Sequence, residues 1–272
     1  MDHRLVCTAA LFAGLAAVSA RAATCPPNTV KVSTVCVDRY EASIWSIPPT
    51  NPSGGSNAAL LNKVRGAKVT LAELLAGGAT QVSPSPTCAG FYPITFPDTG
   101  NWTAPLYAVS VPGVHPSACM TWFQAEQACR LSGGRLLTNQ EWQAAAAGTP
   151  DPGTDNGTTD CNISTAATAV DAGSRSGCKS AWGAFDMVGN VSEWVADWVP
   201  GSTGCPGWNI FSGGSTTADS MCFAGASAAQ ANASALVRGG AYQAIGGDAN
   251  PGVFDVIGFF STSTGNGAIG FR

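Results

Sequence analysis

Helical periodicity in this chain is confined to three short segments. Thr121 to Gln124 fits a capping box, so a helix is predicted from there to about residue 131, where two glycines follow. Thr138 to Glu141 fits a second capping box and predicts a helix to about residue 147. Residues 70–76, closed by a Gly-Gly pair, are a third candidate.

Alternation of apolar and polar residues predicts only short strands, at 34–41, 106–111 and 236–238. Segments 46–58, 79–103, 148–180 and 200–234 are dense in Gly, Pro, Ser, Thr, Asn and Asp, and predict long loops. Long loops in a compact domain usually carry function or need special anchoring. The sequence shows no internal repeat, so we expect one loop-rich domain over residues 23–272.

The first 22 residues are typical of a secretory signal peptide. Residues 5–18 are apolar, and Ala20-Arg21-Ala22 offers the small-x-small pattern of a cleavage site after Ala22. A lipoprotein acylated at Cys25 is the weaker alternative, because Thr24 is large for the preceding position. No later run reaches the roughly 18 apolar residues of a membrane span. We expect an exported protein, periplasmic or extracellular.

The charge balance is acidic and the chain is poor in charge. The net charge is −4, and removal of residues 1–22 makes it −5. Charged residues are 11% of the chain, below the roughly 25% of an ordinary domain. Nucleic acids and anionic membranes bind clustered Lys and Arg, so neither is an expected partner.

The cysteines agree with export. Nine remain after Cys7 leaves with the signal, so disulfides with one thiol left over are expected. No Cys-x-x-Cys pair occurs, which argues against a zinc ribbon or a thioredoxin-type site. Sequence neighbours suggest three pairs, Cys25–Cys36, Cys161–Cys178 and Cys205–Cys222, although sequence alone does not decide connectivity.

One stretch, residues 183–194, has the residue types of a cation site. It places Asp186 and Glu193 around a Gly189-Asn190 turn, where positive φ is tolerated and carbonyls can point inward. Carboxylates and carbonyls form the all-oxygen set that calcium prefers. The alternative is a tight turn pinned by a polar network beneath a tryptophan.

Six stretches in this order resemble the formylglycine-generating enzyme (sulfatase-modifying factor) family, a branch of the C-type-lectin-like folds. They are 36–41, 121–122, 134–142, 185–198, 237–242 and the final Gly-Phe-Arg at 270–272. The resemblance covers nearly all of the mature chain. It implies a single α+β domain, loop-rich, with short strands and two to three helices.

The resemblance also implies a structural calcium. Its ligands would be the side chains of Asp186 and Glu193 and the carbonyls of Gly189 and Val191. A second family site would fall at Asn162 and Ile163, where the following loop differs in length and carries an added cysteine.

The family's oxidase chemistry is not expected here. The two cysteines that bind copper in the family match Ala244 and Ala249, and no cysteine follows Cys222. Copper(I) needs soft thiolate ligands, which alanine cannot supply. Copper is therefore not an expected cofactor. The family's cysteine after Gly-Phe-Arg is also missing, so Cys129 needs another partner or stays free.

Other chemistry has little support in the sequence. His115 is the one histidine outside the signal, so a histidine-based iron centre is excluded, and no Gly-x-Ser-x-Gly turn presents a serine nucleophile. Asp38 and Glu41 suit structural ion pairs with Arg135 or Arg238, with paired acid–base catalysis as the alternative.

The stretch 243–266 replaces the family's active-site wall and carries Asp248, Asn250 and Asp255 beside phenylalanines. Such residues suit a sugar or peptide ligand, or an ordinary loop with its own apolar cluster. The leading hypothesis is a non-oxidase binding or accessory module with a protein, peptide or glycan ligand. The alternatives are a family enzyme with altered chemistry, as in relatives linked to siderophore maturation, and a purely structural surface role.

Overall fold

The computed structural model describes residues 24–82, 88, 105–150, 155–201, 221–222, 233–243, 251–263 and 265–272. In these ranges it has four helices: α1 Ala58–Arg65, α2 Leu71–Ala76, α3 Trp122–Leu131 and α4 Asn139–Ala146. The strands are β1 Thr29–Val32, β2 Val35–Asp38, β3 Ser43–Ser46, β4 Thr80–Gln81, β5 Leu106–Val109, β6 Ser192–Pro200, β7 Met221–Cys222, β8 Ala233–Arg238, β9 Val256–Ile257 and β10 Ile269–Phe271.

Three helices begin at capping boxes; those of α3 and α4 were predicted, whereas α2 was predicted only as a candidate helix. At α2, α3 and α4 the side chain of the threonine before the helix accepts a hydrogen bond from the backbone N–H three residues on. The Glu or Gln side chain at that third residue accepts a hydrogen bond from the backbone N–H of the threonine. Helix α1 was not predicted. Its cap residue Asn57 makes no side-chain cap hydrogen bond, and only Leu60 and Val64 are buried. One apolar i, i+4 pair is too short a signal to detect by periodicity.

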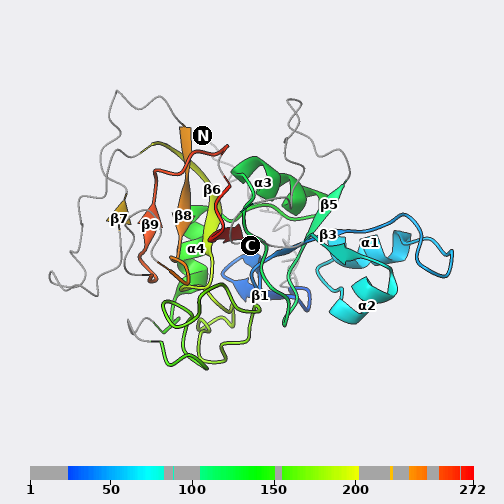
Figure 1. Ribbon diagram of the computed structural model, residues 1–272, viewed down its shortest axis with the longest axis horizontal. Coiled ribbons are helices and arrows are strands. Elements are labelled where there is room, and N and C mark those ends of the chain that lie inside the picture. The colour runs from blue at the N-terminus through cyan, green and yellow to red at the C-terminus, as the bar shows by residue number, and fades with distance from the viewer. Residues whose placement is uncertain are drawn as a thin grey trace, which may run out of the picture.

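The largest sheet has five strands in the order β10-β6-β8-β9-β7 (Figure 1). Its longest strand, β6, contains Glu193 and Trp194 and pairs in parallel with β10 and antiparallel with β8. Glu193 thus lies between Gly270 on one side and Arg238 on the other. The final Gly-Phe-Arg therefore lies beside the strand that carries the Glu193 carboxylate.

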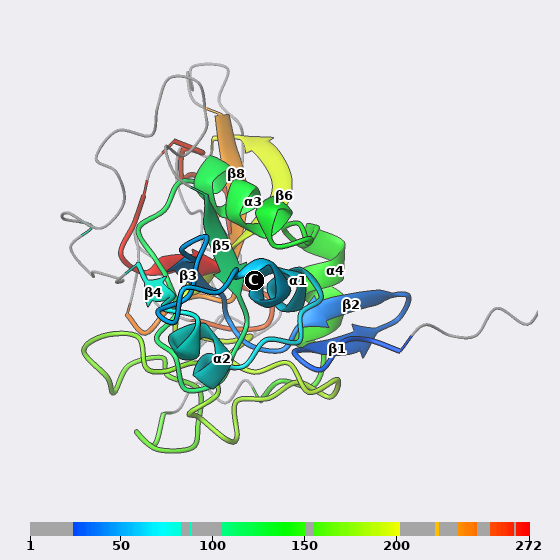
Figure 2. The same cartoon turned by 90° about the vertical axis from the view of Figure 1, so that its right-hand side faces the viewer.

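The remaining strands form two smaller sheets. β3 lies between β4 and β5, and β1 and β2 form a separate antiparallel hairpin. Helices α1 and α2 lie beside the β3–β5 sheet (Figures 1 and 2), at the opposite end of the molecule from β7 and β9 (Figure 1). Helix α3 contacts both β5 and β6, so it joins the two sheets.

Three large apolar clusters fill the spaces between these layers. The first joins α3 to the five-stranded sheet and includes Trp194, Ile269 and Phe271. The second packs the hairpin and α4 around Trp142, and the third packs α1 and α2 against β3 and β5. No helix in the described ranges is long and apolar enough to cross a lipid bilayer.

Disulfides join Cys25 to Cys36, Cys88 to Cys119 and Cys161 to Cys178. The first and third were predicted, whereas the second joins residues 31 positions apart and was not. Cys129 is buried and free. The predicted Cys205–Cys222 pair lies outside the described residues, because Cys205 and the side chain of Cys222 are not described.

Candidate metal and ligand sites

The turn before β6 is shaped by three residues with positive φ: Asp186 at 56°, Gly189 at 72° and Asn190 at 58°. At Gly189 a side chain would also collide with its surroundings, because an added Cβ would lie 2.4 Å from the carbonyl oxygen of Asn162. Glycine is therefore required at 189 on both conformational and steric grounds. The turn buries residues 186–191 completely.

The Asp186 carboxylate is buried and only half satisfied. Its Oδ2 accepts a hydrogen bond of 2.7 Å from the Gly173 backbone, whereas no described residue donates to Oδ1. Burial raises the pKa of Asp186 to about 7, against the lowering effect of the Gly173 bond. A buried acceptor oxygen without a donor costs on the order of 1–3 kcal/mol, unless water or a cation meets it.

Two backbone carbonyl oxygens of the same turn also lack a hydrogen-bond donor among the described residues. No described residue donates a hydrogen bond to the carbonyl oxygen of Gly189 or of Val191. Three of the four ligands expected for calcium, counting Asp186 Oδ1, thus lack donors in the described part of the chain. Oxygen acceptors of this type fit a hard cation.

The fourth expected ligand, Glu193, is fully occupied. Its carboxylate accepts bonds of 2.9, 3.0 and 2.6 Å from the Arg272 guanidinium and one of 2.8 Å from the Trp142 indole. Both side chains of the Glu193–Arg272 pair are almost entirely buried. A cation at Glu193 would have to share this carboxylate with Arg272, so the Glu193 side chain is the ligand that fits the ion least.

A polar network holds the turn in place, as the alternative in the sequence analysis expected, although the sequence did not reveal which residues form it. Glu41 accepts bonds from the Val191 backbone at 3.0 Å and from the Asn190 side chain. Asn190 Oδ1 in turn accepts from the Val170 backbone at 2.7 Å and from Asn162 Nδ2 at 3.1 Å. Burial raises the pKa of Glu41 well above its usual range, and the nearby carboxylate of Asp186 adds to the effect.

Glu41 and Asp38 were expected to pair with Arg135 or Arg238, and the structure corrects this. Arg135 instead forms two bonds to Glu141, of 2.7 and 2.6 Å. Arg272 is the guanidinium that faces Asp38 and Glu41. The sequence did not predict that Arg272 would face these carboxylates, because it lies more than 230 positions from β2 along the chain.

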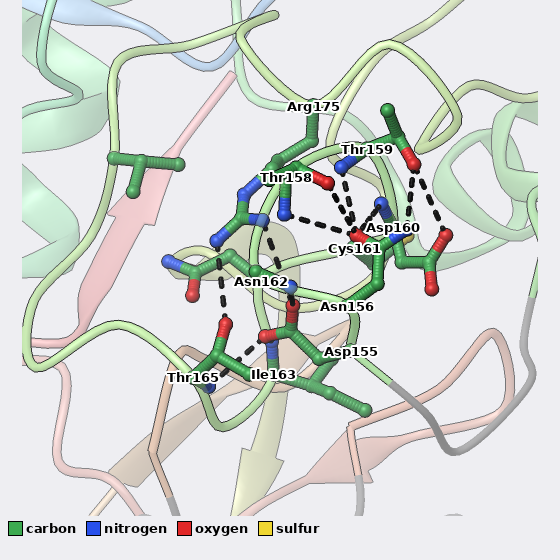
Figure 3. Close-up of polar contacts among 12 residues, drawn as sticks. Asp155, Asn156, Thr158, Thr159, Asp160, Cys161, Asn162, Ile163, Thr165 and Arg175 are labelled. Atoms are coloured by element: carbon green, nitrogen blue, oxygen red, sulfur yellow. Dashed lines mark hydrogen bonds and ion pairs between the residues drawn. The ribbon is translucent and has the colours of Figure 1, made fainter.

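Residues 155–178 form a loop closed by the Cys161–Cys178 disulfide and braced from within (Figure 3). Asp155 Oδ2 accepts from the backbone N–H groups of Ile163, Ser164 and Thr165 at 3.0–3.2 Å. Its Oδ1 lies 3.6 Å from Arg175 Nη1, and both side chains are buried. These hydrogen bonds hold the pKa of Asp155 far below its usual range, although burial opposes them.

The second possible calcium site therefore lies in a loop that already contains a buried positive charge, the Arg175 guanidinium. The Ile163 N–H donates a hydrogen bond to Asp155, and the Asn162 carbonyl oxygen accepts one of 2.8 Å from the Asn190 backbone N–H. The Asn162 Oδ1 atom is buried without a donor among the described residues. Arg175 supplies the positive charge inside this loop (Figure 3).

Of the three predicted ligand-binding residues, the structure describes only Asp255. Asp248 and Asn250 lie outside the described residues, as do Ala244 and Ala249. Asp255 is completely buried, and an added Cβ on Gly240 would lie 2.6 Å from its Oδ2. Asp255 is therefore not on an exposed contact face, whereas the nearby Phe254 side chain is 41% exposed.

His115 Nδ1 lies 3.6 Å from Asp171 Oδ1 near the surface, and burial lowers the pKa of His115. The described residues contain no group of three or more His, Cys, Asp and Glu side chains arranged to hold a metal. Any calcium in the turn would thus depend on carbonyl oxygens as well as carboxylates.

Comparison with solved structures gives only weak likenesses. The Major Tropism Determinant P3c variant is 19% identical over 56% of this chain and 36% of its own length, with a TM-score of 0.35. CarF is 19% identical over 59% of this chain and 67% of its own length, with a TM-score of 0.33. Treponema denticola variable protein 1 is 18% identical over 57% of this chain and 69% of its own length, with a TM-score of 0.30.

This chain spans little more than a third of the Major Tropism Determinant variants. All three TM-scores are below 0.5, so these likenesses support no conclusion about function. No curated protein matches the chain.

The family comparison is decisive. The sulfatase-modifying factor enzyme 1-like domain matches residues 98–272, which is more than half of the chain and includes the 183–194 turn, β6, β8 and the final Gly-Phe-Arg. The predicted family and its α+β fold class are confirmed. This chain belongs to the sulfatase-modifying factor enzyme 1-like family.

Proposed function

We propose that this protein is an exported binding or accessory module of the family, without the family's copper-dependent oxidase activity. The observation that carries the proposal is the pair of alanines at 244 and 249, where the family places its copper-binding cysteines. A methyl group offers no lone pair to a metal, so a copper(I) centre of the family's kind has no thiolate ligands.

Export is supported by the three disulfides of the described residues, because disulfides persist in oxidising compartments. The contact face would be the stretch 243–266, where Asp248 and Asn250 offer polar groups to a peptide, protein or glycan. Buried Asp255 would support this stretch from beneath and would not touch the ligand.

The test of the proposal is a metal and oxygen assay on the purified protein. We expect no stoichiometric copper by mass spectrometry and no oxygen consumption with cysteine-containing peptides. The matched comparison is the Ala244→Cys/Ala249→Cys double variant, which restores the two thiols and should gain copper. Tight copper or turnover in the unaltered protein would reject the binding-module proposal in favour of altered chemistry.

We also propose a structural calcium in the turn before β6. Asp186 Oδ1 and the carbonyls of Gly189 and Val191 would hold it, because these buried oxygens have no donors among the described residues. Glu193 would contribute only by sharing its carboxylate with Arg272. The ion's positive charge would offset the cost of burying the Asp186 carboxylate.

A chelator tests the calcium proposal. Ethylenediaminetetraacetate should lower the melting temperature by roughly 5–10 °C if calcium was present at about a hundred times its Kd. Asp186→Asn should melt lower in calcium and lose this response, whereas the exposed control Asp171→Asn should keep it. If the chelator leaves the melting curve of the unaltered protein unmoved, the turn holds no calcium.

A further inference from the structure

A cavity of about 380 Å³ lies between hairpin β1–β2, strand β5 and the C-terminal ends of α1 and α3. Figure 2 shows the hairpin β1–β2 beside α4, which contacts β1. The volume is within the roughly 300–1,000 Å³ typical of small-molecule sites. It contains neither the residues of the proposed calcium turn nor those of the 243–266 stretch.

One wall of this cavity is apolar. It is made by aliphatic side chains from the hairpin, α1 with the segment after it, β5 and the start of the α4 region: Val35, Val64, Val69, Ala108, Val109 and Leu137. Such a wall favours a ligand with an aliphatic part, at roughly 25 cal/mol for each Å² of apolar surface removed from water.

Asp38, at the end of β2, supplies an unpaired acceptor to the cavity. No described residue donates a hydrogen bond to its carboxylate. The nearby Arg272 guanidinium donates to the Asp38 carbonyl at 3.1 Å, but its other bonds go to Glu193, Phe185 and the Arg39 carbonyl. Burial raises the pKa of Asp38 to about 6. A protonated amine would supply the charge-assisted bonds that this carboxylate lacks.

Arg65, the last residue of α1, supplies an unpaired donor at the same cavity. Its only hydrogen bond in the described structure is a long one, 3.4 Å from Nε to the Leu131 carbonyl, which leaves both Nη groups available. By contrast, Arg135 in the same lining is held by two bonds to Glu141. A free guanidinium fork matches the geometry of a carboxylate.

We propose that this cavity binds a small aliphatic zwitterion of the amino-acid type, with its ammonium at Asp38, its carboxylate at Arg65 and its side chain against the valines. Among the described residues, the cavity thus offers a carboxylate without a hydrogen-bond donor and a guanidinium whose two Nη groups make no hydrogen bond, beside an apolar wall. This site is independent of the proposed contact face and of calcium.

Calorimetric titration of the purified protein at pH 7.5 tests the assignment with three probes. L-leucine carries both charges, leucinamide lacks the carboxylate and N-acetyl-leucine lacks the amine. We expect L-leucine to bind at least tenfold more tightly than either derivative. Absence of saturable L-leucine binding up to about 10 mM, a limit that covers Kd values near 1 mM, would overturn the proposal.

Two variants assign each charge. Asp38→Asn should weaken L-leucine about tenfold or more, yet leave N-acetyl-leucine unchanged, because only the amine contact is lost. Arg65→Gln should weaken L-leucine and leave leucinamide unchanged. Asp160→Asn and Arg130→Gln, which change residues outside the cavity lining, are the matched controls. Unaltered L-leucine affinity in both cavity variants would also reject the site.

The free thiol of Cys129 gives a readout that needs no variant. It lines the cavity and is buried, so its alkylation, followed by mass spectrometry of the peptide that contains it, should slow when L-leucine is present. Leucinamide and N-acetyl-leucine at the same concentration should protect it less. Equal protection by all three would contradict recognition of both charges.

Discussion

The fully and partly buried carboxylates of this protein differ in how many hydrogen-bond donors they have. Glu193 accepts bonds from a guanidinium and an indole, whereas Asp186 has a single backbone donor. Asp38 has no hydrogen-bond donor among the described residues. The carboxylates with few or no donors have raised pKa values, because burial raises the pKa of Asp186 to about 7 and the pKa of Asp38 to about 6. Carboxylates short of donors are therefore where this fold can accept a cation.

The raised pKa of Asp38 makes a prediction about stability and pH. The native state binds this proton more tightly than the unfolded state, so its contribution is present below pH 3.8 and is lost as pH rises through about 6. Asp38→Asn should remove that loss, on the order of 1–3 kcal/mol. Urea unfolding at pH 4, 5, 6 and 7 should show a flatter profile for the variant. Parallel profiles for the two proteins would contradict the assignment.

At the scale of elements, helix caps and disulfides define the boundaries in a chain with little periodic structure. The α4 box combines the Thr138 cap with Glu141, whose carboxylate also binds Arg135. The hydrogen bonds from Arg135 hold the pKa of Glu141 at about 2. One turn of helix thus gathers several polar contacts, each visible as a residue type in the sequence.

Thr138→Ala tests the contribution of this cap. The variant leaves the Glu141 backbone N–H without its acceptor, so the free energy of unfolding should fall by about 1 kcal/mol. Gln140→Ala, at an exposed position of the same helix, should change it by less than about 0.5 kcal/mol. Denaturant unfolding of both variants measures the difference, and equal losses would show that the cap contributes nothing specific.

The disulfide framework makes a prediction about thiols. If Cys205 and Cys222 pair, the chain without its signal should have one free thiol, Cys129, when titrated under denaturing conditions. Without denaturant it should react slowly, because Cys129 is buried and burial raises its pKa. Three thiols per chain would mean that Cys205 and Cys222 are unpaired.

At the scale of the whole molecule, Arg272 joins segments that are far apart in sequence. Its guanidinium bonds Glu193 on β6, the Asp38 carbonyl on β2 and the Phe185 carbonyl before the turn. Strand β10 brings Arg272 there by pairing in parallel with β6 (Figure 1). The hairpin, the turn and the five-stranded sheet thus share one buried guanidinium.

Arg272→Met should therefore destabilise the protein by about 3–5 kcal/mol, because it leaves the Glu193 charge buried and unpaired. Arg272→Met/Glu193→Gln should recover much of the loss, since neither charge then remains. Melting and urea unfolding of the two single variants and the double variant form a mutant cycle. Additive losses would show that the pair has no coupling.

The family, the fold class, three helix starts and two disulfides could be predicted from the sequence, because each depends on residue types within a short span. Capping boxes and cysteine pairs 11 and 17 residues apart are local signals. The alanines at 244 and 249, on which the proposed loss of copper binding rests, are equally local.

Only the tertiary structure decided which charges meet. Asp38 and Glu41 face Arg272 rather than Arg135, Glu193 is occupied by Arg272, and Asp255 is buried. Helix α1 and the cavity beneath it also had no local signal. Such contacts join residues up to 234 positions apart. The physical reason is that a buried charge takes its partner from whichever segment the fold places beside it, and spacing along the chain does not encode that position.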